Sequence, residues 1–292
     1  MCGIFGVMAG GNKIHDGKLL RQSLSLLAKQ AQSRGRDSSG LVFRRDDIAH
    51  AEVFKGAVPL ETLMKSTLVR AYLDQSISAY QADQSKNFTV FGHSRLVTNG
   101  TQLTGENNQP VIKSNLVAVH NGIVVNDAEL WNQNERLERE FQIDTEIMLA
   151  LIRDQLDRGH SLQTAISTVS GMVEGTIAAA ILSLDSNALL LGTNNGSLYS
   201  LTNGRDLFFF ASEEYQLSLL SKKMGSVLED CDLRQIVSGS GVILDLNSFG
   251  ITHFEFNAAD ARPSGGSSAS LTTVFTSNVT PLDDKRSQLD LV

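Results

Sequence analysis

A cysteine directly follows the initiator methionine, at the head of the glycine-punctuated apolar run GIFGV. Because the residue after Met1 is small, we expect Met1 to be trimmed, which leaves a thiol and a free α-amino group together on Cys2. A thiol with a pKa near 8.5 is mostly protonated at neutral pH, whereas an α-amino group with a pKa of about 7.7–8.0 is partly unprotonated. The amine can therefore accept the thiol proton and activate a nucleophile. The stretch equally fits a first strand with a buried, inert cysteine.

Two arginines, Arg34 and Arg95, lie in or beside predicted loops, where they could have a functional role. Arg34 lies in the segment SRGRDSSG (33–40), in which two glycines enclose charged and hydroxyl side chains, and surface pairing with Asp37 is its simpler role. Arg95 ends an apolar strand, where a buried charge is costly unless it is paired. Since a planar guanidinium matches a carboxylate, Arg95 is either a clamp for a substrate carboxylate or half of a structural ion pair. His93 alone fits a hydrogen-bonded core histidine.

Polar residues also lie at the end of a predicted strand, at 121–122, and at the start of a predicted helix, at Asp144. Asn121 and Gly122 follow the short apolar strand 115–119 and offer side-chain and backbone N–H groups that could hold an oxyanion. The same dipeptide is common in tight turns, and the turn is the reading that the residues alone favour. Asp144 precedes the apolar stripe 147–156 and is placed to cap a helix, although it could also pair with a substrate ammonium.

Hydrophobic periodicity predicts the elements that position these residues. The predicted helices cover 17–33, 59–73, 127–140, 147–156, 161–169 and 213–221, the last with Ser212 as its cap. The predicted strands cover 41–43, 51–54, 115–119, 176–182, 188–191, 198–201, 207–211, 234–237 and 242–246, besides those that carry Cys2 and Arg95. Residues 76–87 are polar and are predicted to be loose. The small alanines of 176–182 predict a strand covered on both faces.

The composition narrows the class of protein. With 292 residues and 41% hydrophobic content, the chain can bury a full core. A net charge of −7 argues against nucleic-acid binding, which favours a basic surface. Two distant cysteines, Cys2 and Cys231, predict neither a disulfide framework nor a zinc site. Without a signal-peptide pattern or a stretch long enough to span a membrane, cytoplasmic residence is expected.

The C-terminal residues differ in composition from the rest. Residues 258–270 are rich in Ala, Ser and Gly, which bury too little surface to order themselves. We therefore expect one domain over 1–257, followed over 258–292 by a linker and a tail that could dock on a partner.

Five stretches then follow one another within residues 1–246: MCGIFG at the start, SRGRDSSG at 33–40, GHSRLVTNG at 92–100, VHNGIVVNDAE at 119–129 and DTE at 144–146. In this order they resemble the glutaminase domain of the class II, N-terminal-nucleophile glutamine amidotransferases. The resemblance implies an α+β fold, a four-layer αββα sandwich, and hydrolysis of the L-glutamine side-chain amide to glutamate and ammonia. It implies no metal and no organic cofactor.

The resemblance also implies a role for each matching residue. Cys2 matches the nucleophile, Arg34 the residue that positions the terminus, and Asn121 with Gly122 the oxyanion hole. Arg95 matches the clamp on the glutamine α-carboxylate and Asp144 the acceptor of its α-ammonium. Thr98 is expected to complete the pocket.

The sequence departs from the family pattern in two ways. Leu96 and Asn99 stand where members often have an aromatic residue and a histidine, which leaves the branch of the family open. Members such as glucosamine-6-phosphate synthase, amidophosphoribosyltransferase and asparagine synthetase carry a second, larger domain that uses the ammonia. We expect a synthetase or transferase on another chain to accept it here, unless the residues represent a free-standing or excised glutaminase domain.

Two other functions fit the same residues. The chain could be an N-terminal-nucleophile amidohydrolase that acts on γ-glutamyl amides, because Arg95 and Asp144 fit that substrate as well. It could also be a catalytically silent glutamine-binding subunit, particularly if Met1 stays attached and blocks the amine.

Overall fold

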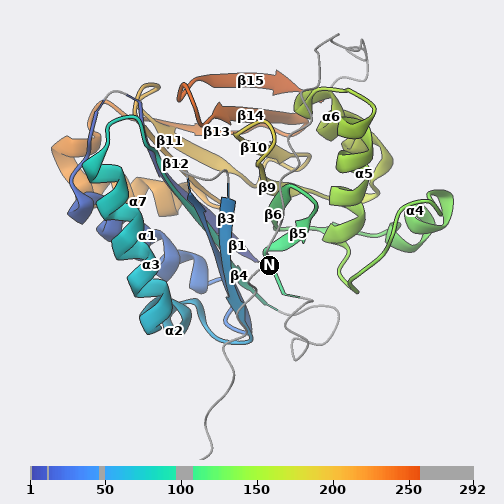
Figure 1. The fold of residues 1–292 in the computed structure, drawn as a ribbon, viewed down its shortest axis with the longest axis horizontal. Helices are drawn as coiled ribbons and strands as arrows, with labels where there is room; N and C mark the ends of the chain where they lie inside the picture. Colours follow the sequence, from blue (N-terminus) through green and yellow to red (C-terminus); the bar gives the residue numbers. More distant parts are fainter. Residues whose placement is uncertain (1, 12, 46–49, 97–107, 257–292) are drawn as a thin grey trace, which may run out of the picture.

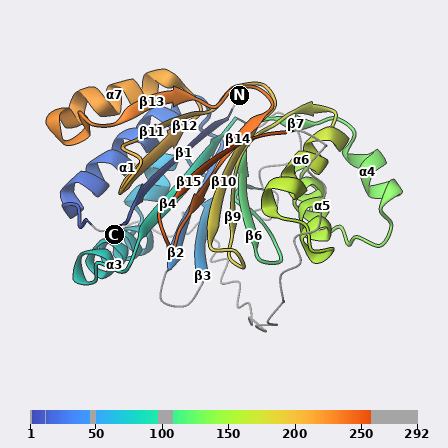
Figure 2. The same ribbon diagram turned by 90° about the horizontal axis from the view of Figure 1, so that it is seen from above.

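Two antiparallel sheets lie face to face and carry helices on their outer faces (Figures 1 and 2). The computed structural model describes residues 2–11, 13–45, 50–96 and 108–256. In both views the layers run helices, sheet, sheet, helices. The predicted αββα sandwich is therefore confirmed.

The first sheet holds the strand that begins next to Cys2 in its centre. Its strands are, in spatial order, β13 (Asp232–Gln235), β11 (Tyr199–Thr202), β12 (Leu207–Ala211), β1 (Gly3–Ala9), β4 (Phe88–Arg95), β2 (Ser38–Arg45) and β3 (His50–Gly56). Because β1 is antiparallel to β4, with Gly3 opposite Ser94, the start of β1 lies beside the end of β4. The fold thereby brings Cys2 and Arg95 to the same edge.

The second sheet is built mainly from the C-terminal half. Its strands are, in spatial order, β15 (Ile251–Glu255), β14 (Ser240–Asp245), β10 (Ala188–Thr193), β9 (Ala178–Ser183), β6 (Leu116–His120) and β5 (Val111–Lys113). A separate pair joins β7 (Ile123–Val124) to β8 (Gly175–Thr176). Every residue of β9 is buried, as its alanines predicted.

The helices form the two outer layers. The first sheet is covered by α1 (Gly17–Gln32), α2 (Leu60–Lys65), α3 (Thr67–Ala82) and α7 (Glu214–Met224), which runs on into the 3₁₀ turn Gly225–Leu228. On the other side of the molecule lie α4 (Asp127–Gln133), α5 (Thr145–Asp157) and α6 (Leu162–Met172). The side chain of Asp16 caps α1, and that of Ser161 caps α6.

Strand β1 shows how the layers are held together. Its side chains alternate, so that Phe5 and Val7 pack among the helices while Ile4 and Met8 pack between the sheets. All of these side chains are buried completely. The strand that leads away from Cys2 is therefore fixed on both faces.

Three sequence predictions about elements are wrong. Residues 76–87 are not loose throughout, because α3 continues to Ala82 and buries Ile77 and Tyr80. The helix predicted over 127–140 ends at Gln133. Ser212 does not cap α7: its hydroxyl accepts from the backbone N–H of Ile4 at 2.9 Å, which ties β12 to β1.

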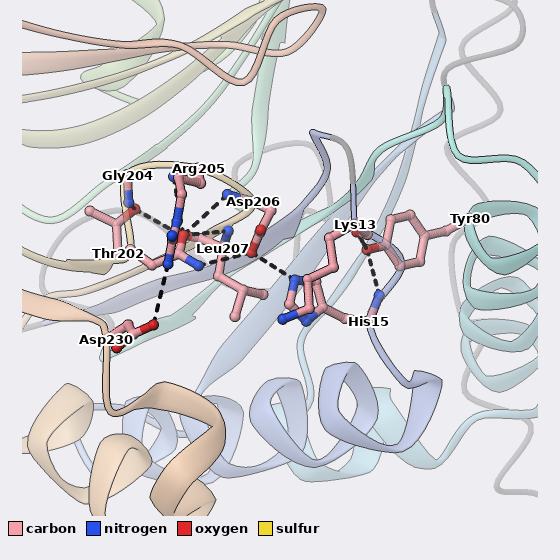
Figure 3. A network of polar contacts seen from close by, with 10 residues as sticks. Lys13, His15, Tyr80, Thr202, Gly204, Arg205, Asp206, Leu207 and Asp230 are labelled. Carbon is pink, nitrogen blue, oxygen red and sulfur yellow. Dashed lines mark hydrogen bonds and ion pairs between the residues drawn. The ribbon is translucent and has the colours of Figure 1, made fainter.

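A polar network anchors the end of β1 that lies far from Cys2 (Figure 3). The buried ring of His15 bonds through Nε2 to Oδ1 of Asp206 at 2.8 Å. The Tyr80 hydroxyl accepts from the His15 backbone N–H at 3.0 Å and donates to the carbonyl of Lys13 at 2.9 Å. Helix α3, the turn before β12 and the segment after β1 are joined there. Thr202 lies in the same region and donates to the carbonyl of Leu207.

Two sequence predictions fall on other parts of the chain. Thr98 and the 258–292 tail lie outside the described residues, so the structure does not test them. Among the residues that it describes, no helix is long and apolar enough to cross a membrane.

Candidate active site

Cys2 lies where the two sheets meet, at the start of β1. Its backbone nitrogen donates a hydrogen bond to Oδ1 of Asn121 at 3.1 Å. Asn121 follows β6 of the second sheet, 119 positions along the chain. Two residues that the sequence singled out separately are therefore brought into direct contact.

The surroundings of the Cys2 thiol act on its acidity in opposite directions. Burial is the largest influence and raises the pKa of the thiol above its ordinary value. A hydrogen bond from the backbone of Leu96 and the positive charges of Arg95 and Arg34 lower it in part. Cys2 is thus half-buried, and two guanidinium groups lie near the charge that forms on deprotonation.

Arg34 reaches this site from the end of α1. A glycine follows it because a Cβ at position 35 would come within 2.2 Å of the backbone nitrogen of Leu96. The Ser94 hydroxyl donates to the Gly35 carbonyl at 2.6 Å and binds the loop to β4. The largely buried guanidinium of Arg34 forms an ion pair with Glu213, which precedes α7.

Arg95 is the last residue of β4, and only 9% of it is exposed. Its backbone carbonyl accepts from the N–H of Asp37 at 3.0 Å, which joins the Arg34 loop to the same strand end. Its charge acts on Cys2, as described above. The carboxylate-clamp role of Arg95 stays a prediction.

Asn121 and Gly122 do not form the hairpin turn that their residue types favoured. Strand β7, which follows them, pairs with β8 rather than with β6. The Asn121 backbone N–H donates to the carbonyl of Ala178 at 2.8 Å. A Cβ at position 122 would lie 2.0 Å from the Thr176 carbonyl oxygen and 2.4 Å from Nε2 of His120, so the chain requires glycine there.

Asp144 stands at the N-cap position of α5, but its side chain makes no capping bond, so the capping prediction is wrong. Its backbone is already in the helical region, with φ −59° and ψ −30°. Its Oδ2 instead accepts from the backbone N–H of Val124 at 2.8 Å. The carboxylate therefore faces the segment that follows Gly122.

Two buried histidines lie beneath these residues. The His120 ring contacts Oγ1 of Thr145 through Nδ1 and the Thr176 carbonyl through Nε2, each at 3.1 Å. Burial lowers the pKa of His120. His93 is completely buried too; its ring contacts the backbone of His120, although neither ring nitrogen makes a hydrogen bond of ordinary geometry within the described residues. Burial, aided by the charges of Arg95 and His120, lowers the pKa of His93 to about 3.

Sequence reasoning missed two residues that support this site. Glu213 pairs with Arg34 from a position 179 residues away. Gln109 holds the backbone of His120 with both ends of its amide: it accepts from the N–H at 2.5 Å and donates to the carbonyl at 2.9 Å. Nothing in the local sequence signals either contact, because each partner is distant along the chain.

Within the described residues, no three His, Cys, Asp or Glu side chains gather closely enough to hold a metal ion. The groups at hand are a thiol, an amide, two guanidinium groups and a carboxylate. They suit nucleophilic attack on a carbonyl carbon, stabilisation of an oxyanion and recognition of a charged ligand.

Comparison with known proteins identifies a glutamine amidotransferase domain. A family model described as a glutamine amidotransferase domain matches residues 93–218, a range that includes Arg95, Asn121, Gly122 and Asp144. A glutamine–fructose-6-phosphate aminotransferase from Bartonella quintana (strain Toulouse) is 29% identical over 237 residues, which cover 80% of this chain and 35% of that protein. Another from Bradyrhizobium diazoefficiens is 27% identical over 247 residues, with 84% and 37% covered. The chain spans little more than a third of the length of these relatives.

A solved structure shares the fold. Glutamine phosphoribosylpyrophosphate amidotransferase from B. subtilis superposes with a TM-score of 0.61 at 23% identity, over 88% of this chain and 49% of that one. The family match covers the motifs at 119–129 and 144–146 and nearly all of the motif at 92–100. The chain carries a glutamine amidotransferase domain, in agreement with the resemblance to the class II, N-terminal-nucleophile family.

Proposed function

We propose that the chain hydrolyses the side-chain amide of L-glutamine, with Cys2 as the nucleophile. The observation that carries this proposal is the bond between the Cys2 backbone nitrogen and Oδ1 of Asn121. Removal of Met1 turns that nitrogen into an α-amine, which Asn121 then holds next to the thiol.

The first step is attack of the Cys2 sulfur on the carboxamide carbon, with the thiol proton passing to the α-amine. Because Oδ1 of Asn121 faces the Cys2 nitrogen, its NH₂ group points away and can donate to the developing oxyanion. The backbone N–H of Gly122 is the second donor. No side chain obstructs it, since Gly122 carries none.

The tetrahedral intermediate collapses when the C–N bond breaks. The protonated α-amine gives its proton to the leaving nitrogen, which departs as ammonia and leaves a thioester on Cys2. Water then attacks the thioester, with the α-amine as the base, and releases glutamate and the free thiol.

Two charged residues recognise the amino-acid end of the substrate. Arg95 binds the α-carboxylate and Asp144 accepts from the α-ammonium. Support for both roles comes from their position at the element ends around Cys2 and Asn121. Arg34, held by Glu213, positions the nucleophile. Thr98, outside the described residues, completes the pocket.

The ammonia is passed to a synthetase or transferase domain, as the names of the curated relatives suggest. Those relatives are named for transfer from glutamine to fructose-6-phosphate. The acceptor of this chain is identified by retaining the protein on a column and sequencing the synthetase or transferase that co-purifies with it.

The decisive experiment compares the two cysteines. Wild-type protein is expected to release ammonia and glutamate from L-glutamine, and Cys2→Ala is expected to bind glutamine without turnover. Cys231→Ala is the matched control, because Cys231 packs beside helix α7 and the first sheet, away from Asn121, and should retain the wild-type rate. Intact mass reports whether Met1 is removed.

Three outcomes separate the possible functions. Turnover in Cys2→Ala rejects the proposed nucleophile. Faster release from γ-glutamyl amides than from glutamine identifies the related amidohydrolase. Glutamine binding without turnover in the wild type, with Met1 retained, identifies a silent subunit.

A further inference from the structure

Three side chains below the proposed ammonium site compete for one proton. Nδ1 of His120 lies 3.1 Å from Oγ1 of Thr145, and the same Oγ1 lies 3.4 Å from Oδ1 of Asp144. His120 and Thr145 are both buried, 1% and 0% exposed, so water cannot supply a substitute partner. Since a hydroxyl has one proton, Thr145 can donate to the histidine or to the aspartate but not to both.

The Thr176 carbonyl determines whether Thr145 donates its hydroxyl proton to His120 or to Asp144. A carbonyl oxygen only accepts hydrogen bonds, so Nε2 of His120, 3.1 Å away, must carry the ring proton. Burial lowers the pKa of His120 and so favours the neutral ring, although the negative charge of Asp144 and the bond to Thr176 oppose this. A neutral ring with its proton on Nε2 has a bare Nδ1, which can only accept, and Thr145 must donate to it.

We infer that His120 draws the hydroxyl proton of Thr145 away from Asp144 and so leaves Oδ1 of Asp144 without a competing donor when it accepts the α-ammonium of the substrate. This inference rests on the function proposed above. Oδ2 of Asp144 is occupied by the backbone N–H of Val124 at 2.8 Å. His120 and Thr145 are therefore positioning residues that set the selectivity of the site for a free amino acid.

The opposite tautomer would weaken the site in two ways. With the proton on Nδ1, a lone pair on Nε2 would face the Thr176 carbonyl, and Thr145 would be free to donate to Asp144. The ring cannot turn over easily, because Gly122 packs so closely that a Cβ there would lie 2.4 Å from Nε2. The backbone of His120 is also clamped by Gln109. The packing thus maintains the ring orientation in which Nε2 faces the Thr176 carbonyl.

A rescue experiment tests the competition. His120→Gln places an amide that can reach the Thr176 carbonyl but has no atom at the Nδ1 position, so Thr145 is expected to turn to Asp144. The KM for L-glutamine should then rise about tenfold, with less change in kcat. Adding Thr145→Val removes the competing hydroxyl, and the double variant should recover a several-fold lower KM than His120→Gln alone.

Two controls make the result specific. Thr202→Val added to His120→Gln removes a hydroxyl from the distant turn of Figure 3, and should leave the KM of His120→Gln unchanged. Glutaric acid monoamide, which is glutamine without the α-amino group, should show no rise in KM with His120→Gln. A double variant whose KM equals or exceeds that of His120→Gln, or an equal rise for both substrates, would overturn the inference.

A spectroscopic measurement keeps the test independent of folding and of the proposed function. In ¹⁵N-labelled wild-type protein at pH 7.5, the His120 shifts should show a neutral ring with its proton on Nε2. A proton on Nδ1 overturns the inference even if the enzyme is active. Failure of the proposed function appears separately, as a wild-type protein that releases no ammonia from glutamine.

Discussion

The backbone nitrogen of Cys2 donates to Oδ1 of Asn121 at 3.1 Å. This contact fixes which way the amide of Asn121 is turned, because an N–H can only bond to its oxygen. The NH₂ group therefore lies on the side away from the backbone of Cys2. One side chain can hold the terminus with one atom and an oxyanion with the other.

Asn121→Asp should separate these two tasks. The aspartate keeps an oxygen for the Cys2 nitrogen but replaces the oxyanion donor by an acceptor, so kcat should fall by about 10²–10³. The KM for glutamine should change much less. The measurement is steady-state ammonia release, with Asn121→Ala as a comparison that loses both atoms. A kcat within a few-fold of wild type would contradict the assignment of Asn121 as a donor.

Arg34→Met should make the Cys2 thiol less acidic. The positive charge of Arg34 lowers the pKa of the thiol against the larger effect of burial, so its removal raises that pKa further. The pH midpoint of alkylation by iodoacetamide, measured in a Cys231→Ala background, should move to higher pH. Arg158→Met is the control, because Arg158 is exposed and pairs with Asp154 on α5. An unchanged midpoint would show that Arg34 acts only through packing.

Much of this fold could be predicted from periodicity and turn chemistry. The helix over 17–33 and the strand 207–211 were predicted within a residue or two of α1 and β12. Strands such as β1 bury side chains on both faces. Such a strand needs a second layer on each side, which is consistent with a sheet packed between helices and another sheet. The prediction of a loose segment over 76–87 is wrong for the end of α3. Ile77 and Tyr80 continue the buried apolar face of this helix, but the polar residues around them hide the helical pattern in the sequence.

The site was predictable as a set of residues but not as a set of contacts. Asp144 and Ser212 both have side chains suited to capping, and both bond elsewhere: Asp144 to Val124, Ser212 to Ile4. From the local sequence, the expected partner of a capping side chain is a backbone N–H a few residues away. In the folded chain, N–H groups that are distant in the sequence also come within hydrogen-bonding distance, and these two side chains bond to them. The same reason hid Glu213, whose partner Arg34 becomes its neighbour only after folding.

Asp144→Asn should weaken binding of the substrate ammonium while the local structure stays intact. Asparagine keeps an oxygen for the Val124 N–H and loses the negative charge. Since hydrogen bonds to charged groups contribute about 1.5–3 kcal/mol, the KM for L-glutamine should rise about 10- to 100-fold. Glutaric acid monoamide, without an α-ammonium, should show little change. An equal loss for both substrates would mean that Asp144 supports the fold and does not bind the ammonium.

His93 should make the protein less stable in acid. Its pKa is about 3 in the folded chain and near the ordinary value of about 6.5 when unfolded. Between these values the unfolded chain binds more protons, so the free energy of unfolding falls as the pH drops below about 6.5, by up to about 1.4 kcal/mol per pH unit. The stabilisation is fully present above pH 6.5.

His93→Leu removes this dependence and tests its cause. An apolar side chain replaces a buried polar ring whose nitrogens make no hydrogen bond of ordinary geometry within the described residues, so stability at pH 7 should be equal or higher. In urea unfolding between pH 4 and 7, the free energy of unfolding should fall less steeply with decreasing pH than in wild type.

Part of this pH dependence remains in His93→Leu, because burial also lowers the pKa of His120. The exposed His253, changed to Gln, should leave the wild-type slope intact. Parallel curves for His93→Leu and wild type would show that His93 is not the group whose protonation unfolds the protein, and His120 would then be the next residue to change.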